Sequence, residues 1–377
     1  MATLPLRPAM IADVTIQRVQ GVQRVRGIAV SLFAGAGGLD VGGGRAGYEV
    51  RAAVEWERDA AATMEKNFDR LVSPVICKDI LDTPTRVILR AAGLRAGQRP
   101  DLLIGGPPCT PFSKSGFWLE YKREGLDPGA SLLQAYTRVL AEARPRRFVL
   151  ENVYALTYRN KASRPAFDRL MREIDAAGYH CDAKVLNAAD YGVPQARPRL
   201  FIIGVPKDEP CPRLPDPTHG GQWERRATGD PRRPHVTAGE ALAGLVTEPE
   251  PGESVNGKYG HLLPAIPPGD NYLFYTARRG HPDALFRWRG KYWSFLLKLS
   301  PDKPAPTIQA QPGPYVGPFH WDNRRLRVGE IKRLFTYPDD YEFVGSRASV
   351  QAQLGNSVPP LLAERVVGSF CAGRSSC

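Results

Sequence analysis

The sequence predicts an open α/β fold, and two observations support this prediction. The apolar segment 28–34 runs directly into the turn Gly35–Gly38, and a helix is expected from Leu39. This order of strand, glycine turn and helix is typical of nucleotide-binding units. Two further short strands are expected, at 102–104 and 147–150, and each is followed by residues that can bind ligands or take part in chemistry. Since sheets of this class bind ligands at the carboxyl ends of their strands, we expect the functional site there.

Composition limits the class of protein. The 377 residues can form two domains, and 51 basic against 39 acidic residues give a net charge of +12, which favours a polyanionic partner. The six cysteines form no CxxC pair, which argues against a zinc site and against a disulfide-stapled secreted protein. The sequence shows neither a long apolar membrane segment nor the apolar core of a signal peptide, so we expect a cytoplasmic protein without a membrane partner.

The segments after the glycine turn offer ligand-type residues. A strand expected at 50–54 is followed by Glu55, about twenty positions beyond the turn, where an acidic residue suits a pair of ribose hydroxyls. Trp56 could then cover an adenine face. Asp79, after a short strand expected at 74–77, could accept a hydrogen bond from an exocyclic amine. The alternative is that Glu55 and Asp79 are solvated carboxylates at strand ends.

The next strand leads to a cysteine. Two glycines and two prolines follow residues 102–104 and present Cys109 on a stiff loop, because proline restricts the backbone. The alternative is a buried, inert cysteine. The strand at 147–150 ends in Glu151, and a thiol beside a carboxyl group suggests a nucleophile with a general acid. The polar, glycine-rich segment Lys114–Gly129 is expected to be a mobile loop and a candidate lid.

Polar residues also mark the later segments. Gln195, Arg197 and Arg199 alternate in an extended segment and so project from one face, where the arginines could bind phosphate. Asn356 and Ser357 are expected at a helix entrance, where they could cap the helix or bind a small polar ligand. Helices are expected at 131–142, 165–177 and 328–336 and from residue 361.

Composition changes at Pro206, where proline, glycine and arginine become dense. We therefore expect two domains, one formed by 1–205 together with 325–377, and a second formed by 206–324. Basic and aromatic residues alternate in the later part of 206–324, a pattern typical of nucleic-acid contact. The alternative is a loop-rich β subdomain with its own aromatic core.

As a set, these motifs resemble the DNA cytosine carbon-5 methyltransferases of the bacterial stand-alone type. TIQAQPG (307–313) also resembles the threonine-led turn of the recognition domains in that family. The motifs stand in the order of the family: SLFAGAGGLD (31–40), EWE (55–57), KDI (78–80), GGPPCTPFS (105–113), ENV (151–153), QARPR (195–199), RRLRVGE (324–330) and QLGNSVPP (353–360).

The resemblance implies a fold and a reaction. The fold would be a doubly wound, mostly parallel Rossmann-like sheet with a smaller, loop-rich β target-recognition domain, and double-stranded DNA would lie between them. The enzyme would transfer a methyl group from S-adenosylmethionine, without a metal, to carbon 5 of a flipped-out cytosine in a short DNA sequence. The resemblance also implies a monomer associated with the nucleoid, and it allows a cognate restriction endonuclease that acts on the same site.

The resemblance further implies roles for individual residues. Cys109 would attack carbon 6 of the cytosine, and Glu151 would bind ring nitrogen 3 and the amino group. Arg199 would contact oxygen 2 and orient Glu151, Arg197 would contact the active-site loop or a phosphate, and Pro108 would shape the pocket. The implied cofactor residues are Phe33, Gly35, Gly37, Gly38, Leu39, Glu55, Trp56, Asp79, Ile80, Leu132, Asn356 and Ser357, and the implied DNA contacts are Ser113, Lys114, Gln195, Arg197 and Thr307.

Three alternatives remain open. A tRNA cytosine carbon-5 methyltransferase would share the fold, although the long basic segment 206–324 favours DNA. A nicotinamide-dependent oxidoreductase would explain the glycine turn and Glu55, but hydride transfer has no use for the cysteine loop. A non-catalytic DNA-binding clamp would have no need for both Cys109 and Glu151.

Overall fold

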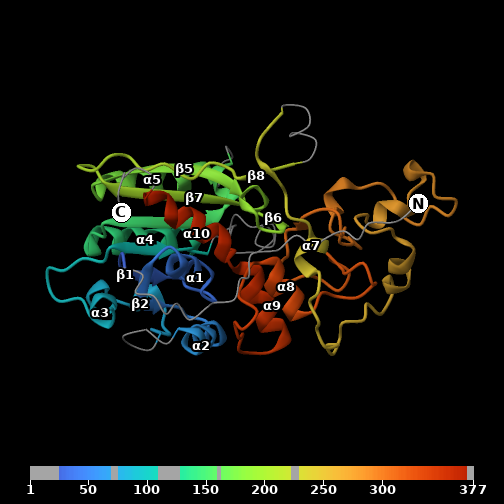
Figure 1. Ribbon diagram of the computed structural model, residues 1–377, viewed down its shortest axis with the longest axis horizontal. Helices are drawn as coiled ribbons and strands as arrows, with labels where there is room; N and C mark the ends of the chain where they lie inside the picture. Colours follow the sequence, from blue (N-terminus) through green and yellow to red (C-terminus); the bar gives the residue numbers. More distant parts are fainter. Residues whose placement is uncertain (1–24, 69–74, 109–127, 159–162, 222–228, 372–377) are drawn as a thin grey trace, which may run out of the picture.

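A central β-sheet organises the larger part of the molecule (Figure 1). The computed structural model describes residues 25–68, 75–108, 128–158, 163–221 and 229–371. The six strands that form the sheet within these residues are β1 (Gly27–Leu32), β2 (Tyr48–Val54), β3 (Leu102–Gly105), β4 (Arg147–Val153), β5 (Tyr179–Asn187) and β7 (Pro198–Pro206). Their order is β2-β1-β3-β4-β7-β5, and β7 is antiparallel to both of its neighbours while the other pairs are parallel. The predicted open, mostly parallel α/β sheet is confirmed.

Helices cover both faces of this sheet. One face packs against α3 (Thr85–Ala91), α4 (Pro128–Ala143) and α5 (Ser163–Ala176), and the other packs against α1 (Gly38–Arg45) and α10 (Pro360–Gly368). Since successive strand residues point to opposite faces, Leu103 and Phe148 enter the first core while Ile104 and Val149 enter the second. The doubly wound arrangement therefore follows from apolar residues on both sides of each central strand. None of the helices in the described ranges is long and apolar enough to cross a membrane.

The predictions match five of the six strands of the sheet and helices α1, α4, α5, α8 (Val328–Leu334) and α10, and the other elements require corrections. The strand expected at 74–77 is absent from its described residues, where Ile76 forms a single isolated bridge with Val54. Helices α2 (Arg58–Asn67) and α3 have no counterpart among the predictions.

Helix α4 begins at Pro128, so the last two residues of the expected loop Lys114–Gly129 are helical, and residues 114–127 lie outside the described part. Strand β5 has no counterpart among the predictions. It is the outermost strand beyond β7, and polar residues such as Asp182 and Lys184 interrupt the apolar pattern that would reveal a strand.

The segment 206–324 has little regular structure in its described part, which matches the expected loop-rich character. It contains α7 (Ala238–Leu242), several 3₁₀ helices and the two-residue strands β8 (His219–Gly220), β9 (Arg233–Pro234) and β10 (Ala305–Pro306). Strand β8 pairs with β9, and β10 pairs with β6 (Gln195–Ala196), which precedes β7. An apolar cluster that includes Leu263, Tyr272, Tyr275, Leu296 and Phe319 fills its centre, and many of its rings meet edge to face.

The C-terminal helices α8 (Val328–Leu334) and α9 (Arg347–Asn356) join the two parts of the chain. They share a buried cluster with Ala238, Leu299 and Ile308 of the middle segment. Ion pairs add to this contact, because Arg327 Nε lies 2.7 Å from Glu253 Oε2 and Arg347 Nε lies 2.9 Å from Glu250 Oε2. Helix α10 then returns to the sheet beside α1 (Figure 1).

Candidate active site

The carboxyl ends of β1 to β4 bring the predicted site segments to one edge of the sheet, because these four strands are parallel neighbours. The Gly35 N–H donates to Glu55 Oε2 over 2.7 Å and thereby joins the ends of β1 and β2. A Cβ atom placed on Gly106, after β3, would lie 3.0 Å from Glu151 Oε2 on β4. Two adjoining centres follow, one around the glycine turn and one around Glu151.

The glycine turn has a backbone that requires small residues. Phe33, Gly35 and Gly37 have φ angles of 53°, 56° and 78°, a region that L side chains rarely adopt. Gly37 is the N-cap of α1, and a Cβ on Gly38 would lie 2.2 Å from the Val358 carbonyl oxygen, so both positions exclude larger residues. A Cβ on Gly35 would meet no atom of the described residues within 4 Å, so none of them fills the space beside the turn at that point.

Glu55 is a buried carboxylate that organises this turn. Besides the bond from Gly35, its Oε1 accepts from the N–H groups of Trp56 and Glu57, each over 2.9 Å. Burial raises the pKa of Glu55, while these three N–H donors act in the opposite direction. A carboxylate oxygen has two lone pairs, so Glu55 keeps acceptor capacity for a ligand hydroxyl.

The other expected cofactor residues differ in how far their side chains are exposed. The Trp56 side chain is 67% exposed, so its ring is accessible to a ligand. Asp79 is exposed, and its carboxylate accepts from the Leu81 N–H over 2.9 Å, which caps a 3₁₀ helix at Ile80–Asp82. Leu39 and Ile80 are buried in the two cores and Leu132 packs partly against the first, so the side chains of Leu39 and Ile80 serve packing.

These residues fit the expected S-adenosylmethionine. The first-turn N–H groups of α1 have no intrahelical partner and favour an anionic group such as a carboxylate. The space beside Gly35 that none of the described residues fills, the acceptor capacity of Glu55 and the exposed ring of Trp56 suit a backbone approach, a ribose and an adenine. In the described ranges, no group of three or more histidine, cysteine or acidic side chains is arranged to hold a metal ion.

The second centre pairs Glu151 with an arginine. Arg199, at the start of β7, lies opposite Val153 of β4, and its Nε is 3.1 Å from Glu151 Oε1. Both side chains are largely buried. Burial raises the pKa of Glu151, and the positive charges of Arg199 and Arg197 act in the opposite direction. A carboxyl group with a raised pKa can hold a proton for a ring nitrogen.

The loop that leads to the predicted nucleophile is anchored beside Glu151. Asn152 Nδ2 donates to the Pro107 carbonyl oxygen over 3.0 Å, and Asn152 Oδ1 accepts from the Val153 N–H. Pro107 is buried and Pro108 is exposed at the end of the described segment. Cys109, Ser113 and Lys114 lie outside the described residues.

Gln195 and Arg197 are completely buried, which corrects the expectation that they contact DNA. Arg197 Nη2 donates to the Gly355 carbonyl over 2.6 Å and Nη1 donates to the Ile308 carbonyl over 3.3 Å. Gln195 Oε1 accepts from the Ile308 N–H over 3.4 Å. Neither side chain has exposed surface with which to contact a phosphate, because both are packed between β6, Ile308 and the end of α9.

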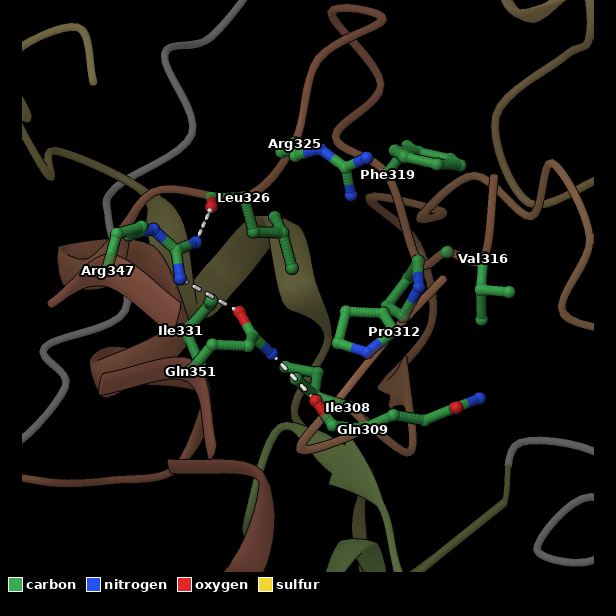
Figure 2. A pocket seen from close by; sticks show the side chains of 12 residues that line it. Ile308, Gln309, Pro312, Val316, Phe319, Arg325, Leu326, Ile331, Arg347 and Gln351 are labelled. Carbon is green, nitrogen blue, oxygen red and sulfur yellow. Dashed lines mark hydrogen bonds between the residues drawn. The ribbon is translucent and has the colours of Figure 1, made fainter. Parts of the chain in front are cut away.

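The threonine-led turn, residues 307–313, is hydrogen-bonded to neighbouring segments at Thr307 and at Gln309. The Thr307 hydroxyl donates to the Ala196 carbonyl over 2.7 Å, so this half-buried group is engaged within the protein. Figure 2 shows Gln351 of α9 donating to the Gln309 carbonyl and Arg347 donating to the Leu326 carbonyl. Gln309, Leu326, Arg347 and Gln351 line a small pocket of about 40 Å³ between the turn and helices α8 and α9.

Asn356 and Ser357 do not lie at a helix entrance, which corrects that prediction. Asn356 is the last residue of α9, a helix that the sequence analysis did not predict, and Ser357 follows it as the C-cap. Asn356 is exposed, whereas the Ser357 hydroxyl is buried 2.5 Å from the Tyr337 hydroxyl. The next helix, α10, begins only at Pro360.

Asp40 is a fully buried carboxyl group in the first turn of α1 that the sequence analysis did not single out. Neither of its oxygens has a hydrogen-bond partner among the described residues, and burial raises its pKa to about 7, with Ser31 acting in the opposite direction. Asp40 and Asn152 lie within the motifs 31–40 and 151–153, whereas Tyr337 and Tyr341 lie between the motifs 324–330 and 353–360. The sequence signal that could have identified Asp40 is an acidic residue between Leu39 and Val41 in the first turn of α1.

The Asp40→Asn variant should be more stable than the wild type at neutral pH. Folding keeps Asp40 protonated up to about pH 7, whereas the unfolded carboxyl group ionises near 3.8, so the wild type loses stability as pH rises between these values. The advantage of the variant should grow over this range and level off above pH 7 at about 4 kcal/mol. Chemical denaturation at pH 5 and pH 8 measures it, with the exposed Asp82→Asn as control. An equal difference at both pH values would contradict the prediction.

Comparisons with known proteins place the chain among related sequences. The family model described as C-5 cytosine-specific DNA methylase matches residues 28–371. The type II methyltransferase M.SacI of Streptomyces achromogenes is 46% identical over 361 aligned positions, and the alignment covers 90% of this chain and 91% of that protein. M.NgoFVII of Neisseria gonorrhoeae is 32% identical, with 88% of this chain and 83% of that protein covered.

Solved structures show the same fold. A putative DNA modification methyltransferase encoded within a prophage of E. coli has a TM-score of 0.65 at 22% identity and covers 91% of this chain and 98% of its own. The S. pombe Dnmt2 methyltransferase has a TM-score of 0.60 at 14% identity and covers 91% of this chain and 98% of its own.

Proposed function

The chain belongs to the family of C-5 cytosine-specific DNA methylases and is a DNA cytosine-5-methyltransferase, and from this premise we propose how its residues perform the reaction. The methyl group of S-adenosylmethionine is transferred to carbon 5 of a cytosine that is flipped out of a short sequence in double-stranded DNA. Cys109 attacks carbon 6 of that cytosine. The observation that best supports this proposal is the buried Glu151–Arg199 pair beside the anchored Pro107.

Glu151 and Arg199 would bind the polar edge of the cytosine. The raised pKa of Glu151 favours a protonated carboxyl group, which can donate to ring nitrogen 3 and accept from the amino group. Arg199 holds Glu151 Oε1 over 3.1 Å and has further N–H groups for oxygen 2 of the ring. A buried pair of this kind excludes water from the ring edge and strengthens each of these bonds.

Cys109 supplies the nucleophile. Its thiolate forms a bond to carbon 6, which moves electron density to carbon 5 and makes that atom nucleophilic. When bound, S-adenosylmethionine supplies an electrophilic methyl group. Loss of the carbon-5 proton to a base then restores the ring and expels the thiolate. Pro107, which Asn152 holds through its carbonyl oxygen, and Pro108 restrict the backbone that presents Cys109.

The glycine turn would hold the cofactor. Phe33, Gly35, Gly37 and Gly38 provide the backbone surface, and Glu55 accepts from the ribose hydroxyls while remaining bonded to Gly35. Further members of this site are the exposed Trp56, Asp79 and Asn356, the backbone at Leu39 and Ile80, and Leu132 and Ser357.

We further propose that residues 1–205 and 325–377 perform the chemistry and that residues 206–324 recognise the DNA sequence. The net charge of +12 and the exposed basic residues of the middle segment, such as Arg287 and Arg289, suit the phosphate backbone. Ser113, Lys114 and Thr307 remain proposed DNA contacts. Because the target atom lies inside the base stack, the enzyme must extrude the cytosine at a cost of a few kcal/mol. The type II names of the relatives support a role beside a restriction endonuclease that acts on the same site.

Bisulfite sequencing tests this proposal directly. We expect plasmid DNA from a host without its own cytosine-5 methylation to show protected cytosines in one short sequence motif once the protein is expressed, and none with the empty vector. Fully converted DNA in the presence of folded protein would refute the DNA substrate. Methylated cytosines in host tRNA alone would instead support the tRNA alternative.

A further inference from the structure

Two tyrosine hydroxyls converge on one carbonyl oxygen of the glycine turn. The Tyr341 hydroxyl donates to the Ala36 carbonyl over 2.7 Å, and the Tyr337 hydroxyl lies 3.4 Å from the same oxygen and 2.5 Å from the Ser357 hydroxyl. Ala36 has no exposed surface, and the two tyrosines are 3% and 5% exposed. The contact is therefore fully inside the protein and cannot be replaced by bulk water.

The tyrosines complete the hydrogen bonding of the turn. The Gly35 N–H donates to Glu55 and the Gly37 N–H donates to the Ala34 carbonyl, so the Ala36 carbonyl is the group that depends on residues from outside β1 and β2. A buried carbonyl group left without a partner costs about 1–3 kcal/mol. Without the two hydroxyls, the turn would avoid that cost by changing its backbone conformation.

The fit between hydroxyls and turn is close. A Cβ on Gly37 would lie 2.8 Å from the Tyr341 hydroxyl, and a Cβ on Gly38 would lie 2.9 Å from the Tyr337 hydroxyl. Each tyrosine therefore rests against one of the two glycines that open helix α1. The tyrosines restrain the same residues whose backbone faces the cofactor.

The tyrosines come from a distant part of the chain. Tyr341 is 305 positions from Ala36 and lies, with Tyr337, just after α8. Both belong to the buried cluster that α8 and α9 share with Ile308 and Leu299 of the middle segment. The conformation of the glycine turn thus depends on the packing of the C-terminal helices.

We propose that Tyr337 and Tyr341 are positioning residues of the cofactor site, which fix the Ala36 carbonyl and so hold Gly35–Gly38 in the binding conformation. This inference rests on the proposed cofactor. The tyrosines touch the turn and act through its backbone. If they served packing alone, removing the hydroxyls would lower the stability of the protein and leave cofactor affinity unchanged.

The test uses Tyr341→Phe and Tyr337→Phe, which remove the hydroxyls and keep the rings. Calorimetry with S-adenosylhomocysteine should show an affinity about five- to tenfold lower for Tyr341→Phe, with a smaller loss for Tyr337→Phe, whose contact with Ala36 is longer. The KM for S-adenosylmethionine should rise by a similar factor while kcat changes less than about twofold. Amides of residues 35–39 should exchange faster with deuterium in the cofactor-free protein.

Tyr179→Phe is the matched control. It also removes a buried hydroxyl that donates to a backbone carbonyl, that of Pro145, over 2.7 Å, but at the far end of the sheet domain. This control should lose a comparable amount of stability and should keep the cofactor affinity of the wild type. Wild-type affinity and exchange in Tyr341→Phe, or an equal affinity loss in Tyr179→Phe, would overturn the inference. If the wild type binds no S-adenosylhomocysteine, the proposed cofactor is refuted, and the exchange of residues 35–39 still decides whether the hydroxyls fix the turn.

Discussion

The Cys109→Ser variant should lose methyl transfer by about a thousandfold or more, the largest effect we expect from any single substitution. A serine hydroxyl is far less acidic than a thiol, so it supplies almost no anion to attack carbon 6 at neutral pH. Incorporation of a labelled methyl group into duplex DNA measures the loss. The variant should also form no covalent complex with a duplex that contains 5-fluorocytosine, because fluorine blocks the release of the enzyme from carbon 5.

The matched control is Cys211→Ser, which changes an exposed free cysteine of the middle segment. It should retain wild-type methyl transfer and wild-type trapping. DNA and cofactor affinities of Cys109→Ser should remain near those of the wild type, which would separate loss of chemistry from loss of folding. Full activity in Cys109→Ser would remove Cys109 as the nucleophile.

The Glu151→Gln variant should lose about 10²- to 10⁴-fold in kcat, the range expected when a general acid is removed. Glutamine keeps the shape of the side chain but cannot hold a proton for ring nitrogen 3. Because burial raises the pKa of Glu151, the wild-type rate should fall as pH rises past that raised value. Single-turnover rates across a pH series measure both effects, and this decline should be absent in Glu151→Gln.

Glu142→Gln serves as control, because Glu142 is a half-exposed carboxylate at the end of α4 that pairs loosely with Arg138. It should have a wild-type rate and a wild-type pH profile. Cofactor affinity should be unchanged in both variants, since Glu151 is proposed to contact the cytosine and not the cofactor. A near-normal rate in Glu151→Gln would refute the role of Glu151 as the acid.

The sequence was sufficient to predict the strands whose residues face apolar cores on both sides. Residues 102–104 and 148–150 are uniformly apolar because β3 and β4 are central strands, and an uninterrupted apolar run is visible without knowledge of its neighbours. Strand β5 and helices α2, α3, α7 and α9 escaped prediction. The outermost strand β5 includes the polar residues Asp182 and Lys184, and α9 has a weak apolar pattern because Arg347, Gln351 and Gln353 form bonds with other segments.

The motifs likewise predicted which residue types take part, since a glycine turn, a rigid cysteine loop and a strand-end glutamate have chemical uses that depend on local sequence. They did not reveal what each side chain contacts. Arg197 was predicted to face a ligand, and the structure buries it against the carbonyl groups of Ile308 and Gly355, which lie 111 and 158 positions away.

The sequence by itself thus determined the α/β class and the family, and it predicted the residue types of the site, because strand pattern and local motifs are short-range properties. Tertiary structure alone decided that Arg199 holds Glu151, that Asn152 anchors Pro107 and that Tyr341 restrains Ala36. These contacts join residues that are 48, 45 and 305 positions apart, respectively. Such partners are set by how the sheet and the C-terminal helices pack, and no local pattern encodes that.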